Sequence, residues 1–289
     1  MKLGIIGGSG FYHLPGLRIS DLVDIETPFG SPSATISVGR LGATDILFLP
    51  RHGGGHIHPP SFLPYRANIY ALKQLGVTHL LSINAVGSLS ESLPPLTLVL
   101  PDQIIDRTVL RVRSFFDDGI VAHVGIADPF CSELSDQIAR ASEVTDVALS
   151  RGGAYVCIEG PQFSTKAESN LYRSWGASVI GMTAMPEARL AREAELCYAS
   201  LALVTDFDVW HSEEEPVTVE LVQSRMQRNT EAAIEIVVAL ANDGLSGRSC
   251  GCGHARDHAI ITNPVNISPE VRARLRVIAG RHLDEGLPA

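Results

Sequence analysis

The sequence predicts a single α/β domain in which helices flank a central mixed β-sheet. Short apolar runs alternate with helical patterns along nearly the whole chain, which is typical of this fold class. Hydrophobic residues make up 45% of the 289 residues and charged residues 19%, so a large core can form. No linker or repeat divides the chain. Residues 1–289 are therefore expected to form one domain, with residues 246–289 as a C-terminal extension packed on it after a glycine- and serine-rich break.

The elements follow from apolar periodicity and from local stop signals. Strands are expected at Leu3–Ile6, Ala34–Val38, Ile46–Leu49, His79–Asn84, Leu96–Ile104, Ala154–Ile158, Ser178–Ile180 and Tyr198–Val204. Helices are expected at Ala67–Leu75, Glu133–Ala141, Ala167–Trp175, Pro186–Ala194, Val219–Ala241 and Pro269–His282. Thr165 and Glu168 have the spacing of a capping box, and Gly176 can end the helix that they begin. Pro186 suits the first turn of the next helix, where its missing N–H costs nothing.

The overall charge argues against two classes of partner. Lys and Arg number 23 against 32 Asp and Glu, a net charge of −9, and a chain this acidic is a poor general binder of nucleic acid or anionic membranes. No apolar run reaches the roughly 18 residues that a membrane span needs. The apolar start of the chain turns glycine-rich too soon for a signal peptide. We therefore expect a cytoplasmic protein without nucleic-acid or membrane partners.

Cysteines and histidines raise the question of a metal site. The five cysteines are odd in number and mostly lie in apolar segments, which fits reduced thiols. Cys250, Cys252 and His254 lie in one short segment, but three ligands so close together cannot easily close a tetrahedral zinc site. His56 and His58 lie in a glycine-rich stretch that lacks a matching Cys or carboxylate set. The sequence therefore predicts no metal, and reduced thiols or, under some conditions, a disulfide at Cys250 and Cys252.

Polar side chains follow several predicted strands, where open-sheet enzymes bind their ligands. Ser9 lies in a glycine-rich turn after the first strand, and glycines let the backbone come close to an anion. Arg51 and His52 follow the strand at Ile46–Leu49, and both can donate to phosphate. Asn84 ends another buried strand among small residues. An ordinary tight turn, a surface Arg-His pair and a strand-ending turn explain the same three segments equally simply.

Asp206 and Asp208 carry the strongest polar signal. They follow a core strand, and carboxylates at i and i+2 of an extended segment point the same way. In a cleft they repel each other, so the pKa of one should rise and that group could hold a proton at neutral pH. An acid/base pair and a cation site are both compatible with this pattern, as are a helix cap and a turn.

Taken together, the motifs resemble the trimeric purine nucleoside phosphorylases, and within that family the 5′-methylthioadenosine phosphorylases. The similar stretches appear in the family's order and span nearly the whole chain: Gly4–Gly10, Arg51–Gly53, Asn84–Leu89, Asp102–Thr108, Asp128–Cys131, Glu159–Ser164, Ala167–Ser169, Gly181–Thr183, Met185–Glu187 and Thr205–Asp208. The resemblance implies the nucleoside phosphorylase fold. It also implies phosphorolysis of 5′-methylthioadenosine to adenine and 5-methylthioribose 1-phosphate, with phosphate as co-substrate and no cofactor, in a homotrimer or a dimer of trimers.

The resemblance also assigns roles to residues. Phosphate would contact Ser9, Arg51, His52, Asn84 (often Thr in the family), Ala85 and Thr183. The ribose would pack on Met182, the purine would stack on Phe163, and the 5′ end would meet Val219, Val222, Gln223, Ile261 and a neighbouring subunit's copy of His123. Asp206 would face N7 of the base and Asp208 its 6-amino group. Gln223 stands where the family usually has an apolar residue, so that a 5′-hydroxyl could be tolerated.

The chemistry of N-glycosidic bond cleavage supports this mechanism, although other functions remain as alternatives. Cleavage of an N-glycosidic bond builds positive charge on the ribose, which bound phosphate stabilises, and negative charge on the base, which a proton at Asp206 neutralises. A 6-amino group is a donor and matches the acceptor Asp208, whereas a 6-oxo group would need a donor. The alternatives are a phosphorylase of adenosine, inosine or 5′-methylthioinosine, a nucleoside hydrolase, and a binding module without catalysis.

Overall fold

The computed structural model describes residues 1–8, 14–211 and 219–283, without the side chains of residues 219–224. Its strands are β1 (Lys2–Gly7), β2 (Arg18–Val23), β3 (Ile36–Leu41), β4 (Thr44–Pro50), β5 (His79–Ser88), β6 (Leu98–Leu100), β7 (Gln103–Asp106), β8 (Leu149–Arg151), β9 (Ala154–Cys157), β10 (Ala177–Gly181) and β11 (Cys197–Asp206). Its α-helices are α1 (Tyr65–Gln74), α2 (Ser132–Ala141), α3 (Lys166–Ser174), α4 (Ala184–Glu193), α5 (Val219–Asp243) and α6 (Pro269–Leu283), and short 3₁₀ turns η2 (Pro60–Phe62), η3 (Ser142–Val144), η4 (Gly251–His254) and η5 (Pro264–Asn266) join them.

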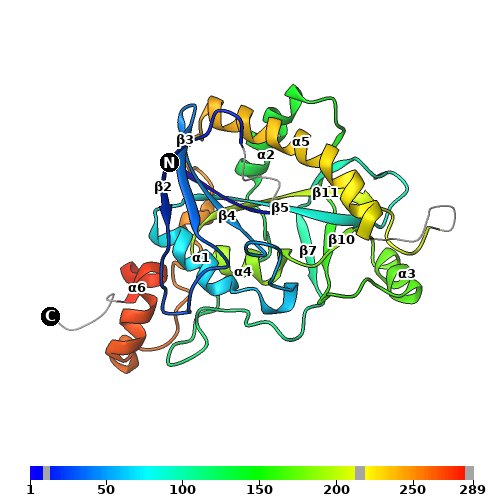
Figure 1. Ribbon diagram of the computed structural model, residues 1–289. Coiled ribbons are helices and arrows are strands. Elements are labelled where there is room, and N and C mark those ends of the chain that lie inside the picture. Colours follow the sequence, from blue (N-terminus) through cyan, green and yellow to red (C-terminus); the bar gives the residue numbers. More distant parts are fainter. Residues whose placement is uncertain (9–13, 212–218, 284–289) are drawn as a thin grey trace.

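One mixed sheet organises the molecule, as the sequence predicts. Its strands run in the order β2-β3-β4-β1-β5-β10-β9-β7, while β11 pairs with β5 and β6, and β8 pairs with β6. The strands β1, β4, β5 and β11 are parallel, and β10 runs antiparallel to β5. Figure 1 shows α2 and α5 on one face and α1, α4 and α6 on the other, with α3 at the end near β10.

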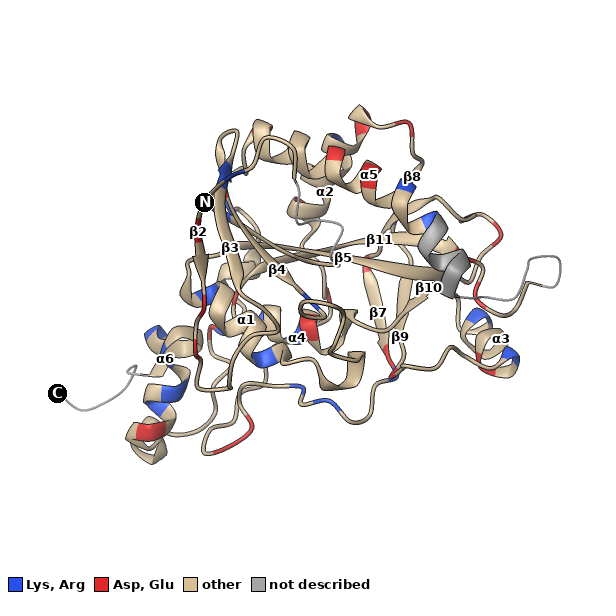
Figure 2. Cartoon of the chain, in the orientation of Figure 1, with Lys and Arg blue, Asp and Glu red and all other residues tan. Residues whose placement is uncertain are grey.

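The two faces of the sheet bury alternate residues of each strand. Leu3 and Ile5 of β1 pack in one cluster with residues of α2 and α5, and Ile6 packs in the other with residues of α1, α4 and α6. Because strand side chains alternate between faces, both clusters draw on the same strands. Charged residues of both signs lie on helices such as α3 and α6, whereas β5 has none and β11 has only its last residue, Asp206 (Figure 2).

β5 exchanges one neighbour for another along its length. β1 pairs with β5 only as far as the partners Ile6 and Ser82, and β10 joins the same edge at Ile180 and Gly87. In the described strand pairings, residues 83–86 of β5 have β11 on one side only. The sheet thus divides between the ends of β1 and β10, beside Asn84.

Local signals were mostly confirmed, and one expected strand was wrong. The capping box forms at Thr165 and Glu168, and Gly176 has a φ of 77° past the end of α3. The strand expected over Leu96–Ile104 is two strands, because Pro101 interrupts the ladder and the chain passes from β6, beside β11, to β7, beside β9. The exposed edge strand β2 and the three-residue β8 were missed, since neither has a clear apolar pattern.

The C-terminal segment packs on the sheet-bearing part through apolar contacts. Val271, Leu275 and Ile278 of α6 belong to the same buried cluster as residues of α1 and α4. Arg256 donates to Glu195 at 2.6 Å and to the carbonyl of Glu193 at 2.8 Å. In the part of the chain that the structure describes, no helix combines the length and apolarity that a membrane crossing requires.

Candidate active site

The acid pair lies at the carboxyl end of β11, where every strand residue is buried. Thr205 Oγ1 donates to Asp206 Oδ2 at 2.7 Å, and the backbone N–H of Asp208 donates to Asp206 Oδ1 at 2.7 Å. Asp208 has a φ of 52°, so the chain turns directly after the strand and does not continue extended as expected. The turn still holds both carboxyl groups inside the protein, with exposed fractions of 6% and 8%.

Gly87 of β5 makes room for this pair. A Cβ atom at Gly87 would lie 2.9 Å from Asp206 Oδ1 and 3.2 Å from the Asp208 Cβ. A side chain at this position would therefore displace the acids. The small residues that end β5 permit a close approach, as the sequence indicated.

The carboxyl group of Asp208 has an unusual environment. Burial raises its pKa to about 6, with the Ser169 hydroxyl opposing this shift and the charge of Asp206 adding to it. Asp208 Oδ2 and the nearby Ser169 hydroxyl are both buried, and they lie close enough to interact, but neither makes a hydrogen bond of regular geometry with a described residue. A buried acceptor without a partner is uncommon in a folded protein and suits a ligand that donates a hydrogen bond.

A second polar group lines the division of the sheet beside β5. Because β10 runs antiparallel to β5 and the last described pair is Ile180 with Gly87, the chain that follows β10 leads toward Thr183 in the direction of Asn84. The Thr183 and Tyr155 hydroxyls are both buried and lie close enough to interact, but neither makes a hydrogen bond of regular geometry with a described residue. Met185, two residues after Thr183, has non-helical dihedral angles (φ −116°, ψ 137°), so the regular turns of α4 begin after it, at Pro186, as the sequence predicted.

The side-chain amide of Asn84 has hydrogen-bond partners at only one of its two polar atoms. Its amide nitrogen donates to the hydroxyls of Ser82 and Ser200 at 3.1 and 3.3 Å, while Oδ1 is buried without a partner in the described chain. Hydroxyls donate as well as accept, so the amide can equally be turned to present N–H toward the division. Either orientation leaves one polar group of Asn84 for a ligand.

Arg51 is engaged mainly by the protein itself. Its guanidinium is 2% exposed and pairs with Glu187 of α4 through two contacts, of 3.1 and 3.3 Å. Nη2 also donates to the Ile6 carbonyl and Ser82 Oγ, and Nη1 donates to the Ile83 carbonyl at 2.9 Å. A guanidinium has five N–H groups, and Nη1 has one acceptor among the described residues. One N–H therefore remains for phosphate, and its predicted role there stays a prediction.

His52 is neutral and has one defined tautomer. Burial lowers its pKa to about 4. Nδ1 lies 2.8 Å from the His58 carbonyl, which can only accept, so Nδ1 carries the proton and Nε2 is an acceptor. A bound phosphate would meet this nitrogen through its own O–H group.

The sequence missed Arg111, a buried cation that fixes the loops around the site. Its Nη1 donates to the carbonyls of Met182 and Met185 at 2.7 and 2.5 Å, and its Nε donates to Glu159 Oε1 at 3.0 Å. These bonds tie the segments after β9 and β10 together. Arg111 had no signal in the sequence, and Glu187 was part of a family-like stretch without an assigned role, because the partners of both residues are far away along the chain.

Comparison with known proteins identifies the family. Residues 2–242 match the phosphorylase superfamily. The chain belongs to the phosphorylase superfamily. Curated relatives include S-methyl-5′-thioadenosine phosphorylases of Cereibacter sphaeroides, 50% identical over 97% of this chain and 98% of that protein, and of Koribacter versatilis, 48% identical over 98% and 97%.

Solved structures of the superfamily agree with the fold. A methylthioadenosine phosphorylase from an Antarctic soil metagenomic library has a TM-score of 0.89 and 46% identity, covering 96% of this chain and 98% of its own. A methylthioadenosine phosphorylase of Schistosoma mansoni in complex with adenine has a TM-score of 0.79 and 38% identity, covering 83% and 91%. The fold class and the family resemblance are confirmed.

The remaining residues expected at a superfamily site divide into three groups. Met182 lies close to Gly160, where an added Cβ would be 2.5 Å from its sulfur, and Phe163 is 47% exposed in the loop that follows. His123 is exposed on a segment that bridges to Ile260, with no described contact to Asp206 or Asn84. The expectations for Ser9 and for the side chains of Val219, Val222 and Gln223 lie outside the described residues.

Proposed function

We propose that the protein cleaves 5′-methylthioadenosine with inorganic phosphate, giving adenine and 5-methylthioribose 1-phosphate. The observation that carries this proposal is the buried pair Asp206 and Asp208, with the unpaired Asp208 Oδ2 and a pKa of about 6. Full-length relatives at about half identity are named S-methyl-5′-thioadenosine phosphorylases, which supports the same substrate.

Phosphate binds at the division of the sheet in this proposal. Thr183 donates its hydroxyl, Asn84 turns its amide toward the anion, and the N–H of Ala85, the remaining N–H of Arg51 and Ser9 complete the site. The Glu187 carboxylate balances the charge of Arg51. Most of the stabilisation of the bound phosphate therefore comes from fixed neutral hydrogen-bond donors. Such donors keep the nucleophile beneath the sugar and need no reorganisation during the reaction.

The base binds over the acid pair. Asp208 Oδ2 accepts from the 6-amino group, and a proton on the N7 side at Asp206 neutralises the base as the glycosidic bond breaks. Phe163, half exposed in the structure, stacks on the purine, and Met182 packs against the ribose. Positive charge that develops on the ribose is stabilised by the phosphate. Beyond this co-substrate, the proposed reaction uses no cofactor and no metal.

The residues expected around the 5′ substituent of the nucleoside suggest a second candidate substrate. Val219 and Val222 suit a 5′-methylthio group, but Gln223, directly after Val222, can hydrogen-bond a 5′-hydroxyl. Adenosine is therefore the alternative substrate. One structural neighbour is named an adenosine/methylthioadenosine phosphorylase.

We further propose a homotrimer in the cytoplasm. His123 and Ile261 are exposed and lie on paired segments, because the N–H of Ile261 donates to the Val121 carbonyl at 3.0 Å and the bridge pairs Ala122 with Ile260. Two exposed side chains carried on one surface can enter a neighbour's 5′ pocket together. A closed ring of such head-to-tail contacts makes a trimer.

A substrate panel tests the proposed function. 5′-Methylthioadenosine, adenosine, inosine and 5′-methylthioinosine are each incubated with the enzyme, with and without phosphate. We expect adenine release from 5′-methylthioadenosine that depends on phosphate, with one sugar 1-phosphate formed per adenine. Equal release without phosphate would indicate a hydrolase, and binding without any turnover would indicate a binding module.

A further inference from the structure

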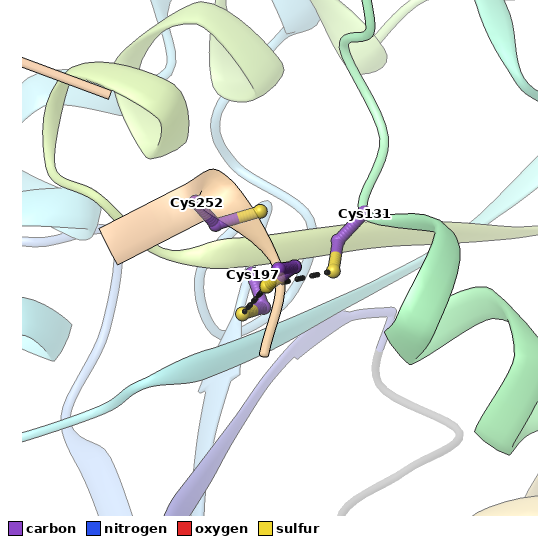
Figure 3. Close-up of side chains that lie close together, drawn as sticks. Cys131, Cys197 and Cys252 are labelled. Carbon is purple, nitrogen blue, oxygen red and sulfur yellow. Dashed lines mark hydrogen bonds between the residues drawn. The ribbon is translucent and has the colours of Figure 1, made fainter. Parts of the chain in front are cut away.

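Four of the five cysteines meet at one point of the fold. Cys131 precedes α2, Cys197 begins β11, and Cys250 and Cys252 lie at the start of η4. Their four sulfur atoms lie within 4.8 Å of one another. Figure 3 shows the side chains of Cys131, Cys197 and Cys252 converging from these three separate segments.

The four sulfurs are arranged as ligands of one ion. Cys250 Sγ lies 3.7 Å from Cys131 Sγ and 3.4 Å from Cys197 Sγ. A tetrahedral zinc ion with Zn–S bonds of about 2.3 Å requires sulfurs about 3.8 Å apart. Two disulfides would instead separate the sulfurs into two pairs, and here Cys250 approaches two partners. Soft thiolates in a tetrahedral set are typical zinc ligands.

The surroundings are suited to a negatively charged thiolate cluster. Arg192 Nη1 lies 3.8 Å from Cys252 Sγ. Cys131 stands at the N-cap of α2, where the helix end favours negative charge. Cys131, Cys197 and Cys252 are buried, while Cys250 is partly exposed and offers a path by which an ion can enter.

We propose that Cys131, Cys197, Cys250 and Cys252 bind one structural zinc ion. On binding, the four thiols release their protons and each sulfur donates an electron pair to the ion. The expectation of no metal weighed two local groups, Cys250 with Cys252 and His254, and His56 with His58. It could not include Cys131 and Cys197, which the fold brings from 119 and 53 residues away from Cys250, while His254 contacts Asp257.

The position of the site defines its role. Cys197 and Asp206 lie at opposite ends of β11, nine residues apart, which is roughly 30 Å of extended strand. The ion is therefore too far from the acid pair to take part in catalysis. It joins the segment around η4 to the first residues of α2 and β11, and so fixes the C-terminal extension to the sheet.

Metal analysis of the full chain, made without an affinity tag and purified under reducing conditions without chelator, tests the proposal. We expect about one zinc per chain and five titratable thiols after denaturation and chelation. Cobalt(II) added after removal of zinc should give the visible absorption of a tetrahedral thiolate site. The proposal would be overturned if the protein contained no metal and had five free thiols. It would also be overturned if disulfides left only one to three free thiols, or if the bound metal were iron and not zinc.

Two variants separate the site from general thiol content. Cys250→Ser with Cys252→Ser should reduce zinc to below about 0.1 per chain and lower Tm by roughly 5–10 °C, with little change in phosphorolysis at 25 °C. Cys157→Ser, which alters the buried cysteine outside the cluster, should keep its zinc. Zinc that is retained in the double variant, or lost equally in Cys157→Ser, would contradict the assignment of ligands. The wild-type cobalt spectrum remains a test even where a variant fails to fold.

Discussion

At the residue scale, the two carboxyl groups of the acid pair differ in their partners. Asp206 accepts from Thr205 and from the Asp208 backbone, whereas Asp208 Oδ2 has no partner among the described residues. Repulsion between the acids was the reason to expect one raised pKa. The structure has a raised pKa at Asp208, with burial as the larger cause and repulsion as the smaller. That Asp206 holds the catalytic proton stays a prediction.

The ionisation of Asp208 predicts an acid limb in catalysis. The pKa of about 6 means that the carboxylate, the better acceptor for a 6-amino group, is lost as pH falls through 6. We expect kcat/KM for 5′-methylthioadenosine to fall tenfold per pH unit well below pH 6, since kcat/KM reports the free enzyme. Asp208→Asn should have lower activity and should lack this limb. Because inorganic phosphate also changes its ionisation state near neutral pH, the limb is assigned by its loss in the variant. The same limb in Asp208→Asn would assign it to phosphate.

At the element scale, helix α4 connects the candidate phosphate site to the far side of the core. Thr183 precedes the helix, Glu187 pairs with Arg51, and the last residue, Glu193, accepts from Ser114 Oγ and the Phe115 N–H at 2.7 Å each. Burial raises the pKa of Glu193 to about 7, and the two hydrogen bonds oppose that shift. The charge of Glu193 thus destabilises the folded state.

Glu193 should make stability depend on pH. Its pKa is higher in the folded than in the unfolded chain, so its contribution is complete below pH 4.5 and is lost as pH rises through 7. Between pH 5 and pH 8, the free energy of unfolding of the wild type should fall by about 2.5 kcal/mol more than that of Glu193→Gln. Urea unfolding at both pH values measures this difference. Glu235→Gln, on the exposed side of α5, is the control, and equal slopes in all three proteins would contradict the prediction.

At the scale of the whole molecule, the division of one sheet creates the candidate site. The parallel strands β1, β4, β5 and β11 end at the same edge, and β10 replaces β1 beside β5. Asn84, Thr183 and the acid pair therefore gather at one edge, although they lie far apart in sequence. His123 and Ile261 remain on the surface of a single chain.

A trimer with shared sites predicts complementation between defective subunits. The mass in light scattering should correspond to three chains of 31.0 kDa, and His123→Ala and Asp206→Asn should each reduce turnover of 5′-methylthioadenosine. Co-expression of the two variants should restore about a quarter of wild-type activity, because about a quarter of sites in random mixed rings combine both intact residues. A fully active monomer, or mixed rings no more active than the variants, would exclude sites shared between subunits.

The sequence predicted those features that depend on local pattern. Most helices and strands followed from periodicity and capping, and the acid pair followed from polar residues directly after a buried strand. Partners brought together by the fold were not predictable. Along the sequence, 136 residues separate Arg51 from Glu187, and 119 separate Cys131 from Cys250. No local signal links such distant positions. Strand exchange beside β5 depends on register, which apolar runs do not specify.

Base selection is the most direct test of the account. 5′-Methylthioadenosine and 5′-methylthioinosine differ in the group at position 6, and Asp208→Asn keeps the side-chain shape while adding a donor that can face a 6-oxo group. A hydrogen bond to a charged group is worth roughly 1.5–3 kcal/mol. The ratio of kcat/KM for the two nucleosides, at saturating phosphate, should therefore shift about ten- to a hundred-fold toward 5′-methylthioinosine in this variant. If kcat/KM for both nucleosides falls by the same factor, Asp208 does not select the base and the account is wrong.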